Sequence, residues 1–174
     1  MASKAGKPTP PNRTGRATAA DTVMTPPHIA KAIVGRYQPT GMVLEPCKGT
    51  GNIFRELPTP RDWCEITQGR DFLQYQKRVD WIITNPPYSI YDLFLAKCFE
   101  VADHVVLLVP IAKAFKSMKI ERMVDEYGGL REIWLMGGGS VCGFGFGFPT
   151  GCLYYQRDYK GPIDRLVQSP LEGS

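Results

Sequence analysis

The chain has 174 residues, 43% of them hydrophobic, which is enough for one domain with a complete core. No apolar run approaches the length of a membrane span, and the N-terminus lacks the apolar core of a signal peptide. The five cysteines form no Cys-x-x-Cys pair and there are only two histidines, which argues against a disulfide framework or a metal site. These features predict a cytoplasmic protein that uses no metal and no membrane anchor.

The positive charge is concentrated at the N-terminus. The formal net charge is +4, and residues 1–24 carry four cations against one anion. This stretch is rich in Pro, Thr and Ala and has no periodicity, so we predict a disordered basic arm. The arm either attracts phosphate groups or is a leader without function. The rest of the chain is close to neutral, so charge alone does not indicate a nucleic-acid partner.

Thr25-Pro26-Pro27 opens the predicted folded part. Thr25 is a natural N-cap, and Pro26 suits the first turn of a helix. An apolar face then recurs at helical spacing, through Ile29, Ile33, Val34 and Tyr37. We therefore predict a packing helix that ends near Gln38-Pro39.

A short buried strand at residues 42–44 leads into the loop EPCKGTGN, residues 45–52. Gly49 and Gly51 permit a positive φ and a close approach of the backbone to a ligand. Phe54 stands where the dinucleotide-binding pattern Gly-x-Gly-x-x-Gly requires its third glycine, so a nicotinamide cofactor is not expected. The following helix must be brief, because two prolines come soon after it.

The next predicted strand, residues 62–66, contains Glu65 near its end. A carboxylate at the end of a strand can accept hydrogen bonds from both hydroxyls of a ribose. The alternative is that Glu65 is a plain surface acid. The sequence Gly-Arg-Asp-Phe-Leu follows at residues 69–73.

Residues 79–84 are a nearly continuous apolar run, typical of a strand buried on both faces of a parallel sheet. Two prolines stop that strand, because neither has an N–H to donate. Ser89 and Asp92 then match the capping box of a following helix. The turn Asn85-Pro86-Pro87-Tyr88 is thus predicted at the carboxyl end of a central strand, where open α/β sheets hold their ligands. A bare Asn-Pro-Pro would be a stiff turn, but these surroundings favour a functional site.

The second half of the chain is predicted to complete the core. Residues 137–151, GGGSVCGFGFGFPTG, interrupt it as a long hairpin loop in which Phe144, Phe146 and Phe148 alternate with glycine. Three exposed aromatic rings in a flexible loop are costly without a partner. The predicted core elements are a strand at 104–110, an amphipathic helix at 116–127, and strands at 131–136 and 152–156, followed by a tail at 160–174.

From about Thr25 to Gln156 these motifs resemble the amino-group methyltransferases that use S-adenosylmethionine. The resemblance is strongest to the adenine-N6 DNA methyltransferases, whose signature is Asn/Asp-Pro-Pro-Tyr/Phe, in the motif order of their gamma-type members. It implies an α/β class I methyltransferase (Rossmann-like) fold over residues 25–159, with a mostly parallel seven-stranded sheet and helices on both faces. It also implies S-adenosyl-L-methionine as cofactor and nucleic acid, DNA more than RNA, as partner.

The resemblance assigns several residues to the cofactor. Thr25 and Pro26 would touch its methionine end, and Glu45 would face its ammonium group. Gly49 and Gly51 would let the backbone meet it.

Further along the chain, the resemblance implies that Asp71 accepts from the adenine amino group of the cofactor and that Phe72 packs near that ring. The chain departs from the family pattern Gly-Asp-Phe-Leu through the inserted Arg70, which makes this register less certain. Glu65 is the candidate for the cofactor's ribose, and Asn85 is counted among both the cofactor-binding and the catalytic residues.

The chemistry explains why Asn-Pro-Pro-Tyr suits an exocyclic amine, whose lone pair is delocalised into the ring. The Asn85 side-chain oxygen and the Pro86 carbonyl would accept both N–H groups, and Pro87 would keep the turn rigid. Tyr88 would stack on the base. One aromatic of the hairpin loop, Phe146 by position among Phe144, Phe146 and Phe148, would form the opposite wall.

Other functions remain open. RNA adenine methyltransferases and protein-glutamine methyltransferases can use the same tetrapeptide, because both act on a planar nitrogen, although the latter usually have a preceding helical domain. A non-catalytic subunit that binds nucleic acid is a further alternative. The sequence contains no second domain of the kind that reads a target sequence, so we expect loose specificity, or recognition by loops, a second subunit or a partner.

Overall fold

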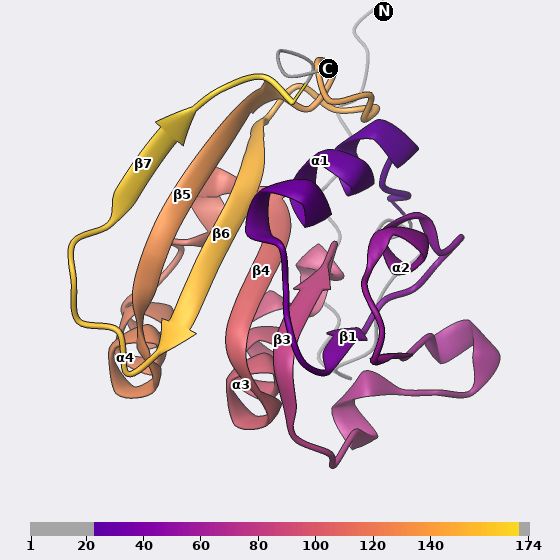
Figure 1. Ribbon diagram of the computed structural model, residues 1–174. Helices are drawn as coiled ribbons and strands as arrows, with labels where there is room; N and C mark the ends of the chain where they lie inside the picture. The colour runs from indigo at the N-terminus through magenta and orange to yellow at the C-terminus, as the bar shows by residue number, and fades with distance from the viewer. Residues whose placement is uncertain (1–22, 171–174) are drawn as a thin grey trace, which may run out of the picture.

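The computed structural model describes residues 23–170, which form a single seven-stranded sheet in the order β2-β1-β3-β4-β6-β5-β7 (Figure 1). β6 runs antiparallel to its neighbours β4 and β5, and every other pair in the sheet is parallel. The predicted mostly parallel sheet of seven strands is therefore confirmed. The strands are β1 Val43–Glu45, β2 Arg61–Trp63, β3 Val79–Thr84, β4 Ala102–Pro110, β5 Gly128–Gly138, β6 Pro149–Arg157 and β7 Asp164–Val167.

Helices cover both faces of the sheet, as predicted (Figure 1). α1 (Pro27–Tyr37) and α2 (Asn52–Glu56) lie on one face, and α3 (Tyr91–Val101) and α4 (Met118–Tyr127) lie on the other. Within residues 23–170, every helix falls short of the length and apolar character that a membrane crossing requires. Four short 3-10 turns complete the structure: η2 Ile66–Gln68, η3 Phe72–Gln74, η4 Tyr88–Ile90 and η5 Ile111–Lys113.

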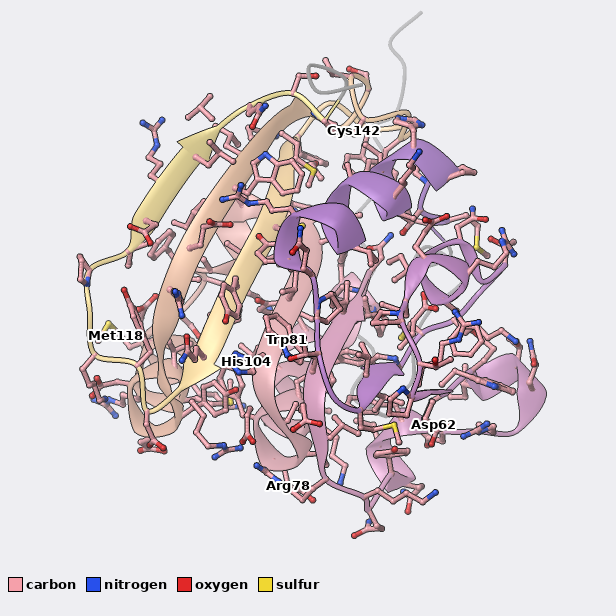
Figure 2. The ribbon with its side chains drawn as sticks, in the orientation of Figure 1. Asp62, Arg78, Trp81, His104, Met118 and Cys142 are labelled. Carbon is pink, nitrogen blue, oxygen red and sulfur yellow. The ribbon has the colours of Figure 1, made fainter. Side chains whose placement is uncertain are left out.

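The core has two layers because successive side chains of a strand point to opposite faces. In β4, Leu107 packs into the layer under α3 and α4, whereas Val106 and Leu108 pack into the layer under α1 and α2. On adjacent strands, the rings of Trp81 and His104 stack with centroids 4.2 Å apart (Figure 2). Core layers thus pack on both faces of β3 and β4, and these two strands provide a rigid base for the turns at their ends.

Two predicted helix caps are wrong. Thr25 does not cap α1, which has Pro26 at its N-cap without a side-chain hydrogen bond. Ser89 does not cap α3 either, because residues 88–90 form η4 and α3 begins only at Tyr91. Tyr91 is fully buried, and its hydroxyl lies 3.1 Å from that of Tyr155, so tertiary packing sets the start of this helix.

The region between α2 and β3 is less regular than predicted. α2 is brief, as expected, and the Arg61 guanidinium donates to the carbonyl oxygens of Phe54 and Leu57 at its C-terminal end. β2 covers only residues 61–63 of this region, so the predicted strand at 62–66 is too long. Glu65 instead begins η2, with its side chain bound to the Thr67 backbone N–H.

The C-terminal part departs from its prediction in two ways. β5 and β6 are longer than expected, which shortens the connecting loop to residues 139–148. The predicted tail at 160–174 is wrong for residues 164–167, because β7 pairs in parallel with β5 and extends the sheet beyond the predicted boundary at 159. β7 is mostly exposed, so its backbone pairing, and not an apolar pattern, makes it a strand.

The topology brings several turns to one edge of the sheet. From β1 the chain passes to β2 on one side, and it returns to β3 on the other side of β1, which creates a switch point between β1 and β3. Glu45 ends β1 and Asn85 follows β3 at this point. Because β6 is antiparallel, the loop at 139–148 lies at the same edge, where Figure 2 labels Cys142.

The pairing of β5 with β6 can be tested at Gly151. A Cβ atom there would lie 1.9 Å from the carbonyl oxygen of Trp134, a backbone atom that no rotamer change can move. We expect Gly151→Ala to lower the free energy of unfolding by about 1–3 kcal/mol or more in urea titrations. The control is Gly145→Ala, where a Cβ meets nothing within 4 Å. Equal stability of the two variants would contradict the strand pairing.

Candidate functional site

A small pocket opens at the switch point between β1 and β3. Its wall comes from three separate parts of the chain: the extended segment before α1, the loop after β1 with the start of α2, and the turn after β3. The lining residues are Val23, Met24, Thr25, Glu45, Cys47, Lys48, Gly49, Thr50, Asn52, Ile53 and Asn85. Three of the predicted cofactor residues, Thr25, Glu45 and Gly49, therefore meet Asn85 in one cavity.

Glu45 is the most unusual group in this pocket. Its side chain is only 2% exposed, and its Oε2 atom is buried without a hydrogen-bond partner among the described residues. Burial raises the pKa of Glu45 to about 8, against the opposing effects of the Phe54 backbone N–H and the nearby Lys48. A buried acceptor without a donor is costly, so a cationic or N–H-bearing ligand in this pocket would stabilise it.

Two glycines set the path of the loop beside the pocket, and Gly49 lines it. Gly49 and Gly51 have φ values of 49° and 79°, in the left-handed region that glycine adopts without strain. A Cβ at Gly49 would lie 2.9 Å from the sulfur of the flexible Met24 side chain, so the positive φ, more than this contact, requires glycine here. Nearby, the Asn52 amide donates to the Thr25 carbonyl oxygen at 2.7 Å and ties that segment to the loop.

The Asn85 amide has a defined orientation. Its Nδ2 donates to the Val23 carbonyl oxygen at 2.9 Å, and a carbonyl can only accept. The Asn85 Oδ1 therefore faces the other way, where it accepts from the Tyr88 hydroxyl at 3.0 Å. An amide oxygen has two lone pairs, so Oδ1 can accept one further hydrogen bond from a ligand.

The rest of the tetrapeptide is held by burial of Pro86 and by a hydrogen bond from Lys113 to Tyr88. Pro86 is buried, whereas Pro87 and Tyr88 are half-buried. The Lys113 ammonium donates to the Tyr88 carbonyl oxygen at 3.1 Å and lies 5.9 Å from the centre of the Tyr88 ring. The turn is thus rigid, and the ring keeps part of its surface open.

Glu65 lies beside the glycine loop but already binds protein groups. Its Oε2 accepts from the Gly49 backbone N–H at 2.8 Å, and its Oε1 accepts from the Thr67 hydroxyl at 2.7 Å. Burial acts to raise the pKa of Glu65, but the hydrogen bonds from Thr67 and Gly49 outweigh it and lower the pKa below its usual value. Glu65 is therefore an ionised acceptor next to the pocket, and its ribose role stays a prediction.

The predicted pair Asp71 and Phe72 lies further out. The Asp71 carboxylate accepts from the Leu73 backbone N–H at 2.9 Å and begins η3. Phe72 is buried against Phe94, with ring centroids 4.8 Å apart, so its ring offers little surface to a ligand. Neither residue lines the pocket, and their proposed contact with an adenine ring stays a prediction.

The three loop phenylalanines are not equivalent. Phe144 is only 6% exposed and packs in the layer under α1, so the expectation that all three rings are exposed is wrong. Phe146 stacks on Phe144 at 5.3 Å and meets the Tyr88 ring edge-on at 6.5 Å. Phe148 is 65% exposed. Phe146 is therefore the loop ring that the structure brings next to the tetrapeptide.

Several residues of the site were not predicted from the sequence. Val23 and Met24 fell within the predicted arm at 1–24, whose residues 1–22 lie outside the described part, and no sequence signal marks them. Lys113 follows a strand end that received no chemical role. Asn52 directly follows the Gly-x-Gly pattern, and that position was the available signal.

Comparison with known proteins identifies the fold. No protein-family model matches the chain, and no curated protein matches it in sequence. A solved structure from Listeria monocytogenes, assigned to the class I S-adenosylmethionine-dependent methyltransferases, is 16% identical, with a TM-score of 0.60 over 84% of this chain and 66% of that one. The chain has the class I methyltransferase fold.

Two proteins of type I restriction systems share this methyltransferase fold. The M protein of the restriction enzyme EcoKI is 15% identical, with a TM-score of 0.62 over 77% of this chain and 44% of its own. The methyltransferase subunit of a restriction-modification system from Streptococcus thermophilus is 13% identical, with a TM-score of 0.61 over 83% and 47%. The present chain thus spans less than half of either protein.

The buried carboxylate predicts an unusual dependence of stability on pH. The pKa of Glu45 rises from its usual value of 4.5 in the unfolded chain to about 8 in the fold. Its contribution to stability is therefore fully present below 4.5 and is lost as the pH rises toward 8. We expect Glu45→Gln to remove this loss, measured by urea unfolding across the same range.

The matched control for that experiment is Glu56→Gln, at an exposed position on α2. This variant should keep the pH dependence of the wild-type protein. If Glu45→Gln and the wild-type protein lose stability in parallel between these pH values, Glu45 is not buried as the structure has it.

Proposed function

We propose that this protein transfers a methyl group from S-adenosylmethionine to the N6 amino group of adenine in DNA. The single observation that supports this most is the orientation of Asn85, which presents an amide oxygen at a proline-locked turn. The turn lies beside a pocket with a buried carboxylate, one of whose oxygens has no partner among the described residues. The fold and the Asn-Pro-Pro-Tyr turn are consistent with this reaction. The three similar solved structures are at most 16% identical to this chain, so their similarity supports the fold and not the substrate.

The residues of the pocket fit the proposed cofactor. Within residues 23–170 the Glu45 Oε2 atom has no hydrogen-bond partner, which suits an ammonium group. Gly49 lines the cavity without a side chain, which suits close contact with a ligand. Thr25 and Asn85 line the same cavity. When bound, S-adenosylmethionine supplies an electrophilic methyl group on a sulfonium.

The chain's own residues prepare the nucleophile. The Asn85 Oδ1 and the Pro86 carbonyl oxygen would accept the two N–H bonds of the adenine amine, which draws the nitrogen toward a tetrahedral shape and frees its lone pair. Because Val23 and Pro87 hold this acceptor pair in place, little reorganisation is needed during the reaction. The acceptors are neutral, so the reaction needs no side chain with a shifted pKa.

The target base has to leave the duplex, because an amine within stacked base pairs is out of reach. Tyr88 and Phe146 offer two aromatic surfaces at the pocket edge, with ring centroids 6.5 Å apart. We propose that Tyr88 stacks on the extruded adenine and that Phe146 borders it from the hairpin loop. Target selection would come from the loops or from a second subunit, since one of the compared structures is named as a subunit of a restriction-modification system.

Substitution of Asn85 tests the acceptor role directly. We expect Asn85→Ala to abolish methyl transfer while it changes the affinity for S-adenosylmethionine by less than about tenfold, or ~1.4 kcal/mol. Asn85→Asp keeps an oxygen acceptor and should retain measurable transfer. Transfer is measured with labelled cofactor and binding by calorimetry. Wild-type rates in Asn85→Ala would eliminate the proposed mechanism.

The substrate class is tested with the same labelled cofactor. We expect the label to appear in N6-methyladenine after incubation with single-stranded or duplex DNA, as established by nucleoside analysis. RNA and a release-factor-like protein are the parallel substrates. Label in RNA alone, or in protein alone, would contradict the DNA assignment and favour one of the other two methyltransferase classes.

The two accessible loop rings provide a matched pair. Phe146→Ala should weaken binding of single-stranded DNA by about 1–3 kcal/mol, since a stacking surface for the base is lost. Phe148→Ala removes an equally large ring that is 65% exposed and lies beyond Phe146, at a centroid distance of 6.0 Å, and it should have a smaller effect. The affinity of each variant for single-stranded DNA is measured by fluorescence anisotropy. A larger effect at Phe148 would reassign the base contact.

A further inference from the structure

A cationic ridge leads away from the tetrapeptide along the segment that joins β4 to α4. The ridge consists of Lys113, Lys116 and Lys119, at a spacing of three residues. We propose that this ridge binds the phosphate backbone of an unpaired DNA strand next to the target base. The inference rests on the proposed function, and it adds a substrate-binding surface outside the pocket.

The inner end of the ridge touches the site itself. The Lys113 ammonium lies 3.1 Å from the Tyr88 carbonyl oxygen and 5.9 Å from the centre of the Tyr88 ring. This ring is the surface on which we place the extruded base. A phosphate within reach of Lys113 would therefore belong to the target nucleotide or its neighbour.

The outer part of the ridge has an excess of positive charge. The ammonium groups of Lys116 and Lys119 lie 3.3 and 3.9 Å from the two oxygens of a single carboxylate, Asp92, which follows the tetrapeptide at the start of α3. One carboxylate cannot neutralise two ammonium groups. Both lysine side chains are also largely exposed, so their interaction with Asp92 is weak and leaves them able to bind a phosphate.

The acidic groups of α4 are Glu121, Asp125 and Glu126, and of these only Glu121 falls within residues 113–122. Glu121 lines a hollow between α4 and the start of β5, which Phe115 also lines. Asp125 is bound by Lys160, whose ammonium lies 3.3 Å from its carboxylate. In addition, Arg122 on α4 adds a fourth cation to the three lysines of the ridge. The surface along residues 113–122 therefore remains positive within a folded part that is otherwise nearly neutral.

Apolar side chains alternate with these lysines and favour an unpaired strand. Phe115 is 58% exposed and Met118 is 69% exposed, and Figure 2 shows Met118 at the margin of the molecule, away from α1 and α2. Cations that track a backbone, combined with exposed rings on which bases can stack, are the usual features of single-strand binding surfaces. Duplex DNA presents its phosphates but not the faces of its bases, so Phe115 would have no partner there.

The test measures binding without catalysis. A fluorescent, adenine-free single-stranded DNA is titrated by anisotropy at salt concentrations from about 50 to 200 mM, without cofactor. Because each phosphate contact contributes about 0.7 to the salt dependence for single strands, K116Q/K119Q should reduce the slope of log K against log salt by about 1.4. K116R/K119R should keep the wild-type slope and affinity.

The matched control is K31Q/K77Q, which removes the same charge from exposed positions on α1 and before β3. This variant should bind DNA with the wild-type slope. A similar loss in both glutamine variants, or no loss in K116Q/K119Q, would overturn the ridge, because binding would then follow net charge alone or another surface. Thermal unfolding checks that all variants are folded.

Methylation separates this inference from the proposed function. Suppose that K116Q/K119Q weakens DNA binding as expected, but neither the wild-type protein nor any variant methylates adenine in any substrate. The ridge then stands and the proposed function fails. If adenine in DNA is methylated and K116Q/K119Q binds like the wild-type protein, the ridge fails and the proposed function stands. A parallel titration with adenine-free RNA that shows the slope change for RNA only would overturn the assignment to DNA.

Discussion

The hydrogen bond from the Asn85 amide to the Val23 carbonyl is the interaction on which the site depends. It joins residues 62 positions apart and decides which end of the amide points toward the open side of the pocket. A carbonyl can only accept, so this contact selects the oxygen of Asn85 as the available acceptor. The two prolines that follow then prevent the turn from relaxing. Orientation of an acceptor, and not an unusual pKa, is what this turn contributes.

The pocket beside Asn85 carries a thermodynamic cost. Glu45 ends β1 inside the fold, where one of its oxygens lacks a partner among the described residues and burial raises its pKa to about 8. A sequence selected for stability alone would place an apolar residue or a fully bonded amide there. A buried acidic group that lowers stability is characteristic of functional sites, and Glu45 lies at the switch point of the sheet.

The direction of β6 explains how distant segments share one edge. Because β6 runs against its neighbours, the loop that joins β5 to β6 comes to the same edge as the ends of β1 and β3. That arrangement brings Phe146 to Tyr88, and the end of β4 brings Lys113 to the same residue. The pocket, the aromatic loop and Lys113 at the inner end of the ridge therefore all border the tetrapeptide.

The sequence by itself determined the elements that depend on local rules. The apolar run at residues 79–84, the prolines at 86 and 87 and the glycines at 49 and 51 specify a buried strand, a stop and a loop with positive φ angles, and these are found as predicted. Tertiary structure alone decided what depends on distant contacts. The start of α3 follows from the packing of Tyr91, β7 exists through its pairing with β5, and Phe144 is buried by α1. The roles of Val23, Met24 and Lys113 also arise only in the fold, because each acts through a neighbour that is remote in the chain and no local pattern encodes such a contact.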